Sequence, residues 1–326
     1  MVLILSREAV EKVLKMSDCI DAVEKAFGEL ASNKAVMPLR PTINVDEYEG
    51  VSLYMPAYLM ETGSLACKIV TVYKNNPQKF NLPTILGTVL LQDPRTGKVI
   101  CMMEGGIVTA MRTGAVTGVA AKYLARKDSK TIGLFGAGAQ GRTQLMAICT
   151  VLDIERCKVY DISAEAANRF KQELEPKLGI KIEVASSPIE AMQNGVVITA
   201  TTSEKPILDG RKLLEGTFVS GIGSHAPTRR ELDTETIKRS KLVVDQKSAC
   251  LAEAGDIVIP IKEGAITEDH VYAELGELVL GKKPGRTNEK EITVFKSVGL
   301  AIQDVATAKL VYDKAKEAGV GVELEI

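Results

Sequence analysis

The chain of 326 residues contains no tryptophan, only two histidines, His225 and His270, and six cysteines, none of which forms a C-x-x-C pair. Histidine and cysteine provide most of the ligands of protein-bound zinc, so this composition argues against a zinc site, and we predict no metal. Cysteines without a pairing pattern are typical of free thiols in the reducing cytoplasm, where we expect the protein to reside.

The sequence also lacks an excess of charge and a long apolar run. Lysine and arginine number 41 and aspartate and glutamate 42, a net charge of −1 that argues against a nucleic-acid partner. No apolar run approaches the roughly 20 residues needed to span a bilayer, and the N-terminus lacks the basic and long apolar regions of a secretory signal. The length and the apolar content of 45% suit two domains, or one large domain with a cap.

Residues 131–161 form the most informative segment. A short apolar strand at 131–135 leads into a G-x-G-x-x-G turn made by Gly136, Gly138 and Gly141, and a second strand ends at Asp161, 20 residues further on. In a dinucleotide site the first glycine permits the turn, the second admits the pyrophosphate and the third allows the helix to pack closely. The pyrophosphate then lies at the helix N-terminus. The glycines alone also fit a turn without a ligand; the strands and the acid favour a nucleotide site.

Asp161 further indicates which cofactor binds. A carboxylate at this position can accept hydrogen bonds from both ribose hydroxyls of NAD, and it repels the 2′-phosphate of NADP. Ile162 and Ser163 follow, so no cation stands directly after the acid to hold that phosphate. The sequence therefore predicts NAD as the cofactor, with NADH preferred over NADPH.

The order of predicted elements indicates an α/β protein with two domains. A Rossmann-type, doubly wound parallel sheet is expected at 116–300, because strands and helices alternate there. An α+β domain is expected at 1–115, with the C-terminal helical segment 301–326 returning to it. The predicted helices are 6–32, 111–126 and 305–316. The predicted strands are 51–55, 65–73, 84–92 and 98–103 in the first domain, and 131–135, 157–161, 181–185, 196–200, 217–222 and 241–245 in the second.

Three cations of the first domain stand in apolar or strand contexts: Arg40, Lys68 and Arg112. Taken singly, each is typical of a salt-bridged surface residue. On a nucleotide-binding chain the three together could converge on a carboxylate, since arginine offers a bidentate fork and lysine a point charge. From the residues alone the interpretation stops at an NAD-linked enzyme that acts on a small carboxylate.

Several stretches together resemble the ornithine cyclodeaminase/mu-crystallin family. They occur in the family's order and span nearly the whole chain: 37–40 (MPLR), 67–70 (CKIV), 82–84 (LPT), 111–115 (MRTGA), 136–140 (GAGAQ), 223–233 and 294–304. The resemblance implies two domains, a homodimer formed through the first domain, and NAD(P) bound in the second.

The resemblance also implies roles for individual residues. Arg40, Lys68 and Arg112 would hold the α-carboxylate of a small amino or imino acid, with Lys68, Arg112 and His225 as the catalytic residues. The implied cofactor contacts, added to Gly136 and Gly138 of the turn, are Thr84, Arg112, Thr113, Ala139, Gln140, Asp161 and Thr202, with Ile222, Gly223, Ser224 and His225 beside the nicotinamide.

Two positions depart from the cyclodeaminase pattern. Cyclodeaminases of the family have aspartate where this chain has His225 and Lys296, whereas its ketimine reductases resemble this chain at Lys296. A lysine lining the pocket would repel a diamine but suits the carboxylate of a cyclic imino acid, so Lys296 is a candidate substrate-binding residue; the alternative is a surface ion pair. His225 can exchange protons near neutral pH; the alternative is a hydrogen-bonded loop residue. His270 is expected to face solvent.

The resemblance therefore favours NADH-dependent reduction of a small cyclic imino acid. The first candidate is Δ1-pyrroline-2-carboxylate, which yields L-proline, and Δ1-piperidine-2-carboxylate is the six-membered counterpart. Three alternatives stay open: alanine dehydrogenase, ornithine cyclodeaminase, and a non-catalytic protein that binds NAD(H) or a small ligand.

Overall fold

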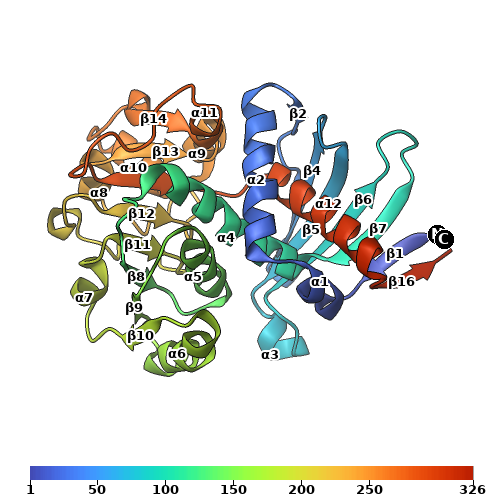
Figure 1. Cartoon of the computed structure of the whole chain (residues 1–326), viewed down its shortest axis with the longest axis horizontal. Helices are drawn as coiled ribbons and strands as arrows, with labels where there is room; N and C mark the ends of the chain where they lie inside the picture. Colours follow the sequence, from blue (N-terminus) through green and yellow to red (C-terminus); the bar gives the residue numbers. More distant parts are fainter. Residues whose placement is uncertain (326) are drawn as a thin grey trace. The chain divides into compact units, whose positions relative to one another are not determined.

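The computed structural model describes residues 1–325 and divides into two compact units (Figure 1). Unit 1 comprises Met1–Thr113 and the segment that starts at Leu300, and unit 2 comprises Gly114–Gly299. The boundaries expected from the sequence lie within two residues of these positions, whereas the binding roles assigned to each domain remain predictions.

Unit 1 contains a mixed sheet of eight strands. Their order is β16-β1-β7-β6-β5-β4-β2, with β3 paired to β4, and only the β1–β7 pair is parallel. The four strands predicted in this unit are confirmed, and four more are present. The strands are β1 (Val2–Leu5), β2 (Ala35–Val36), β3 (Thr42–Val45), β4 (Gly50–Leu59), β5 (Ser64–Tyr73), β6 (Ile85–Gln92), β7 (Val99–Glu104) and β16 (Val322–Leu324).

Strand β4 is longer than the sequence predicted. The predicted strand stopped at Met55 because Pro56 follows, and proline cannot donate a ladder hydrogen bond. In the structure Pro56 pairs in register with Cys67 of β5. On the opposite side β3 and β2 pair with β4 only before and after this point. The N–H of Tyr54 bonds to a residue on the β3 side, so the missing N–H of Pro56, two residues on, falls in the unpaired gap.

Helices α2 and α12 pack on one face of this sheet (Figure 1). The predicted helix 6–32 is two helices, because Leu14 and Lys15 are extended. The predicted face of α2 is confirmed at Ile20, Val23 and Phe27, which are buried. The helices of unit 1 are α1 (Arg7–Val13), α2 (Met16–Ala31), η1 (Asp46–Tyr48), α3 (Asn76–Phe80) and α12 (Ala301–Ala318), and α4 (Gly105–Leu124) runs from unit 1 into unit 2.

Unit 2 is built on an eight-stranded sheet in which every pair is parallel, which confirms the predicted α/β class. The order is β10-β9-β8-β11-β12-β15-β13-β14, so the chain changes direction across the sheet between β8 and β11. Ligands of such sheets bind outside the carboxyl ends of the strands at this switch point. The strands are β8 (Thr131–Phe135), β9 (Arg156–Tyr160), β10 (Lys181–Val184), β11 (Val196–Thr199), β12 (Phe218–Gly221), β13 (Lys241–Val244), β14 (Val271–Glu274) and β15 (Thr293–Lys296).

The central strands of unit 2 carry its core. Every residue of β11, β12 and β15 is buried, as expected for parallel strands with both faces covered. Lys296, at the end of β15, differs from the other residues of these strands because its side chain is charged although it is buried. The helices are α5 (Ala139–Val151), α6 (Ala164–Leu178), α7 (Pro188–Met192), η2 (Gly210–Lys212), α8 (Thr234–Lys238), α9 (Lys247–Glu253), α10 (Gly255–Lys262), η3 (Glu268–His270) and α11 (Leu275–Val279).

Within residues 1–325 no helix combines the length and the apolar character needed to cross a bilayer. The same part of the chain holds no group of three or more histidine, cysteine, aspartate and glutamate side chains arranged to bind a metal ion. All six cysteines are free thiols, and four of them are buried.

Candidate active site

The glycine-rich turn between β8 and α5 has the geometry of a dinucleotide site. Gly136 has a φ of +100°, and a Cβ there would overlap the carbonyl oxygen of Ala200. A Cβ at Gly141 would overlap the carbonyl oxygen of Gly136, so this glycine lets α5 lie against the turn. At Gly138 a Cβ would meet no atom within 4 Å. Packing thus requires two of the glycines, and the third faces open space where a ligand can approach.

The N-terminus of α5 is open to an anion. Gly138 is the N-cap and makes no side-chain capping bond, so the first N–H groups, at Ala139 and Gln140, are left for another acceptor. A phosphate is favoured at such a helix start by these N–H groups and by the helix dipole. Oε1 of Gln140 is a buried acceptor with no hydrogen-bond partner in the protein. These features fit the predicted pyrophosphate position.

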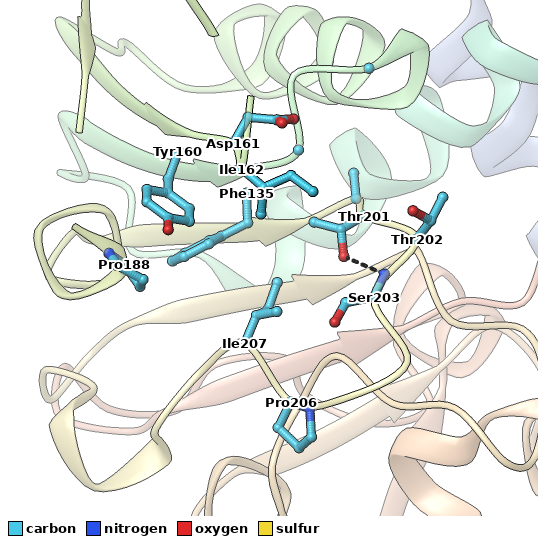
Figure 2. Close-up of a pocket in the computed structure, with 13 residues that line it drawn as sticks. Phe135, Tyr160, Asp161, Ile162, Pro188, Thr201, Thr202, Ser203, Pro206 and Ile207 are labelled. Carbon is cyan, nitrogen blue, oxygen red and sulfur yellow. Dashed lines mark hydrogen bonds between the residues drawn. The ribbon is translucent and has the colours of Figure 1, made fainter. Parts of the chain in front are cut away.

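A cavity of about 670 Å³ opens beside this turn, at the carboxyl ends of β8, β9 and β11 (Figure 2). Its apolar residues include aromatic rings from two strands, whose centroids are 5.9 Å apart. Its polar side chains come from the ends of β9 and β11. The cavity is lined by Phe135, Gly136, Gly138, Tyr160, Asp161, Ile162, Pro188, Ala200, Thr201, Thr202, Ser203, Pro206 and Ile207. A pocket with an apolar side for a base and polar groups for a ribose fits an adenosine moiety.

Asp161 both shapes the turn and faces the cavity. Its Oδ2 accepts the N–H of Ala137 at 2.8 Å, and its Oδ1 accepts the N–H of Ser163 at 2.9 Å. A carboxylate oxygen can accept more than one hydrogen bond, so both oxygens keep capacity for ribose hydroxyls. Ile162, next along the chain, is 98% exposed at the rim.

The predicted cofactor residues fall into three groups. Gly136, Gly138, Asp161 and Thr202 line the cavity, and Ala139 and Gln140 begin α5 beside it. Ile222, Gly223, Ser224 and His225 form the loop after β12. Thr84, Arg112 and Thr113 belong to unit 1, and their contacts with the cofactor remain predictions.

Two of the three predicted cations of unit 1 meet at one buried carboxylate. Nζ of Lys68, on β5, lies 2.8 Å from Oδ1 of Asp304, and Nε of Arg112, on α4, lies 2.9 Å from the same oxygen. Arg112 also donates from its Nη1 to Oε1 of Gln303 at 2.6 Å. Arg40 is half-buried and near enough for its charge to act on Lys68. We call Arg40, Lys68, Arg112 and Asp304 the cation-rich cluster.

The electrostatics around Lys68 and Arg112 favour a bound anion. Burial lowers the pKa of Lys68 to about 8, against a partly restoring effect of Asp304, and the charges of Arg112 and Arg40 lower it further. Lys68 and Arg112 therefore share the single carboxylate of Asp304. An additional anion bound here would be attracted by that excess and would raise the pKa of Lys68 again.

Sequence reasoning missed Gln303 and Asp304 as site residues. Both side chains are fully buried, and the Oδ2 atom of Asp304 and the Nε2 atom of Gln303 have no hydrogen-bond partner in the protein. The signal was present, since both residues end the stretch 294–304 that matched the family. The predicted C-terminal helix, however, started only at residue 305, which left these two residues outside any element.

A second buried cluster of charge lies in unit 2, and Lys296 belongs to it. Nζ of Lys296 lies 2.8 Å from Oδ2 of Asp256 and donates to the carbonyl oxygen of Ser224 at 2.6 Å. Burial disfavours the charge of Lys296, but Asp256 and Glu231 raise its pKa above the usual range. The lysine is therefore a buried rather than a surface ion pair. We call Glu231, Asp256 and Lys296 the anion-rich cluster.

The two histidines lie in different surroundings. His225 is exposed in the loop after β12, with Nδ1 3.3 Å from the carbonyl oxygen of Gly223. His270, expected to face solvent, is half-buried, and its Nε2 lies 2.8 Å from the carbonyl oxygen of Ile237. His225 thus remains the candidate for proton exchange, and His270 fastens η3 to α8.

Comparison with known proteins agrees with this geometry. The ornithine cyclodeaminase/mu-crystallin family matches residues 2–319. Alanine dehydrogenase of Archaeoglobus fulgidus is 40% identical over 323 residues, which cover 99% of this chain and 98% of the relative. The structure of Thermococcus litoralis Δ1-pyrroline-2-carboxylate reductase in complex with NADH and L-proline is 51% identical, with a TM-score of 0.96 and coverage of 99% of this chain and 100% of that one.

A further solved structure is that of an archaeal alanine dehydrogenase dimer with bound NAD. It is 39% identical, with a TM-score of 0.93 and coverage of 100% of this chain and 99% of that one. The matches extend over both units and include the segments that carry the glycine turn and the cation-rich cluster. The chain belongs to the ornithine cyclodeaminase/mu-crystallin family.

Proposed function

We propose that this protein is an NADH-dependent reductase of small cyclic imino acids, with Δ1-pyrroline-2-carboxylate as the first candidate and Δ1-piperidine-2-carboxylate as the six-membered counterpart. The observation that carries the proposal is the 51% identical structure that holds NADH and L-proline, the product of this reaction. The cation-rich cluster supports it, because its excess positive charge matches the single carboxylate of such a substrate.

The chemistry divides between cofactor and protein. NADH supplies the hydride that adds to the imine carbon, and the imine nitrogen gains a proton, so that the ring becomes a secondary amine. In this proposal Lys68 and Arg112 bind the substrate carboxylate and fix the position of the imine carbon. Asp304 holds both cations from the protein side, which keeps their orientation before the substrate arrives. His225 is the candidate that exchanges the proton.

The preference for NADH over NADPH is part of the proposal. The carboxylate of Asp161 borders the cavity, and the next residue is the exposed, uncharged Ile162. The matched test is Asp161→Asn, which removes the charge and keeps the side-chain size. We expect the ratio of kcat/KM with NADH to kcat/KM with NADPH to fall roughly tenfold or more, as steady-state kinetics would measure. An unchanged ratio would show that Asp161 does not set the preference.

Alanine dehydrogenase is the second candidate, because a relative 40% identical over the whole chain bears that name. Pyruvate and the imine formed from it also carry one carboxylate, so the cation-rich cluster does not distinguish the two reactions. Ornithine cyclodeaminase is less favoured, because cyclodeaminases of the family have aspartate at the position of His225. The charge of Lys296 is compensated by Asp256, so Lys296 no longer argues against a diamine.

One set of assays separates the candidates. NADH oxidation is followed by absorbance with the cyclic imine, with pyruvate plus ammonium, and with neither, and ammonia release from ornithine is measured in parallel. Oxidation with the imine at a kcat/KM well above that with pyruvate is the expected result. The reverse order identifies an alanine dehydrogenase, and ammonia release without net NADH change a cyclodeaminase. Tight NADH binding without any turnover would indicate a binding protein.

We also propose a homodimer formed through the sheet of unit 1. Register places Lys68, Met55 and Val89 on the face where Lys68 meets Asp304 of α12. The opposite face is apolar and only partly buried. It includes Tyr54, Leu65, Ile69, Leu86, Leu90 and Met102, of which Leu86 and Met102 are about 40% exposed. A sheet face of this kind is typical of a subunit interface, and the alanine dehydrogenase structure of the family is a dimer.

Light scattering after size-exclusion chromatography tests the dimer. The double variant Leu90→Glu/Met102→Glu places two charges on the apolar face and should yield a monomer. Leu214→Glu, at an exposed leucine of unit 2, is the matched control and should leave the mass unchanged. A double variant that keeps the parent's mass would exclude this face as the interface.

The cytoplasm is the proposed location. All six cysteines are free thiols, as expected in a compartment where glutathione keeps cysteines reduced. Thiol titration of the denatured protein, isolated from cells under conditions that block exchange, should count six free thiols. A protein recovered with cysteines linked to each other would contradict the proposal.

A further inference from the structure

The carboxylate of Glu231 joins two loops at the carboxyl edge of unit 2's sheet. Its Oε1 accepts hydrogen bonds from the N–H and the hydroxyl of Thr201, each at 2.7 Å. Its Oε2 accepts the N–H of Gly223 at 2.7 Å and the hydroxyl of Thr199 at 3.0 Å. Thr201 lies in the loop after β11 and lines the adenosine-sized cavity, whereas Gly223 lies in the loop after β12, which carries His225.

The rest of the anion-rich cluster fixes Glu231 in place. Oδ1 of Asp256 accepts the backbone N–H groups of Glu231 at 2.7 Å and of Leu232 at 2.8 Å. Lys296 pairs with the other oxygen of Asp256 and also holds the carbonyl oxygen of Ser224. The β12 loop is therefore fastened at adjacent residues, at Gly223 by Glu231 and at Ser224 by Lys296.

The position of Gly223 shows how closely the parts fit. A Cβ at Gly223 would overlap the carbonyl oxygen of Thr201 and the carboxylate of Glu231. The two loops are thus in contact at this point, with the carboxylate packed between them. Glu231 is fully buried, so the protein supplies all the hydrogen-bond partners of its carboxylate.

We propose that Glu231 is a positioning residue for the dinucleotide, which sets the loops after β11 and β12 in one fixed relation. The inference rests on the proposed binding of NADH in unit 2. Each carboxylate oxygen receives one backbone N–H, which can only donate, so only an acceptor on both oxygens satisfies them. An amide at this position would direct an N–H group at the backbone N–H of Thr201 or of Gly223 and push that loop away. The threonine that borders the cavity would then shift with its loop.

The test is Glu231→Gln, with Glu268→Gln as the matched control at an exposed glutamate of the same unit. In Glu231→Gln the Kd for NADH, measured by its fluorescence, and the KM for NADH should rise roughly 10- to 100-fold. The KM for the imino acid at saturating NADH should stay within about twofold, because the cation-rich cluster is untouched. A purely structural role would instead lower stability and the active fraction while both constants stayed at the parent's values.

A graded variant keeps the inference testable if Glu231→Gln does not fold. Thr199→Val removes one of the four donors, and Thr199 is a fully buried residue of β11 that does not line the cavity. Its Kd for NADH should rise roughly two- to fivefold. Parent-like NADH affinity in every folded variant would overturn the inference. Because NADH binding is measured without imino acid, failure of the proposed substrate and failure of the role of Glu231 are distinguishable.

Discussion

The two buried charge clusters have opposite compositions. In unit 1 one carboxylate, Asp304, faces Lys68 and Arg112 at hydrogen-bond distance, with Arg40 nearby. In unit 2 two carboxylates, Glu231 and Asp256, share a single lysine, Lys296. Buried charge costs free energy unless it is compensated, so each cluster has to balance its excess.

The clusters differ in how that excess is balanced. In unit 2 the carboxylate of Glu231 receives four hydrogen bonds from the protein, two of them from backbone N–H groups. In unit 1 Lys68 and Arg112 share the one carboxylate of Asp304, and Oδ2 of Asp304 and Nε2 of Gln303 have no hydrogen-bond partner in the protein. Oδ2 of Asp256 in unit 2 also lacks a hydrogen bond, but it lies 2.8 Å from the charge of Lys296. A charge satisfied from within is typical of a framework, whereas a charge left in excess beside unpaired atoms is typical of a ligand site.

Removal of the lysine of the anion-rich cluster should have the largest effect. Lys296→Met leaves Asp256 and Glu231 buried without a counter-charge, and we expect the free energy of unfolding to fall by about 3–5 kcal/mol. Lys68→Met is the matched control, because Arg112 still pairs with Asp304 there, and its change should stay within about 1 kcal/mol. Urea denaturation measures both. Equal losses in the two variants would remove the distinction between framework and ligand site.

When activity is measured in place of stability, Lys68→Met should show a larger loss than Lys296→Met. Loss of a charge-assisted hydrogen bond to the substrate carboxylate should lower kcat/KM for the imino acid roughly 100-fold. Arg112→Lys, which replaces the planar fork by a point charge, should fall in the same range. The Kd for NADH serves as the internal check and should not change. Turnover close to the parent's in both variants would exclude the cation-rich cluster as the carboxylate site.

Titration of Lys68 should appear in the pH profile of kcat/KM. The pKa of Lys68 is lowered to about 8, so the charged form that binds a carboxylate is lost as pH rises through 8, and kcat/KM should fall about tenfold per unit above it. Between about 8 and the unfolded value of 10.5 the unfolded chain holds the extra proton, so the contribution of Lys68 to the free energy of unfolding rises with pH. Activity and this stability contribution therefore move in opposite directions.

Two controls isolate that titration. Lys68→Arg keeps a charge that does not titrate in this range, so the alkaline fall should disappear. The affinity for pyrrole-2-carboxylate, whose ring nitrogen does not titrate here, should follow the same curve as kcat/KM in the parent. An alkaline fall that persists in Lys68→Arg would assign it to another group.

The smallest expected effect is a shift of the pH profile of kcat/KM. Asp304→Asn removes the carboxylate that raises the pKa of Lys68, so the alkaline fall should move to lower pH by roughly one unit. Asp304→Glu keeps the charge and should leave the midpoint nearer the parent's. The pH profile of kcat/KM measures both, and an unshifted midpoint in the asparagine variant would show that Asp304 does not sustain the charge of Lys68.

Local patterns in the sequence predicted most of the fold. Short apolar runs that alternate with helical segments placed the strands of unit 2 up to β13, and the G-x-G-x-x-G turn with Asp161 placed the cavity. The errors arose where the deciding contact is distant in sequence. Pro56 continues β4 because the neighbouring edge is unpaired there. Strands β14 and β15 were missed, although β15 lies between β12 and β13 in the sheet.

The site was predicted less completely than the fold, for the same reason. The cations were found because isolated charges in apolar or strand segments are conspicuous. Their partner Asp304 lies 236 residues from Lys68 and 192 from Arg112 in the chain, so no local pattern joins them. Lys296 was expected near the substrate or at the surface. Its burial depends on Asp256, which carried no signal of its own in the sequence.

The helix α4 limits how this architecture can be recombined. It runs unbroken through Gly105–Leu124, and the division between the units falls inside it, directly after Thr113. A chimera that exchanges the nucleotide-binding half for that of another dehydrogenase cannot be spliced at this division without cutting the helix. A graft that keeps α4 intact has to be joined before Gly105 or after Leu124, so Arg112 either moves with the transplanted half or stays with unit 1 together with the start of unit 2. The choice of junction therefore decides which parent supplies Arg112, the proposed carboxylate-binding arginine, and the other partners of Asp304 have to match it.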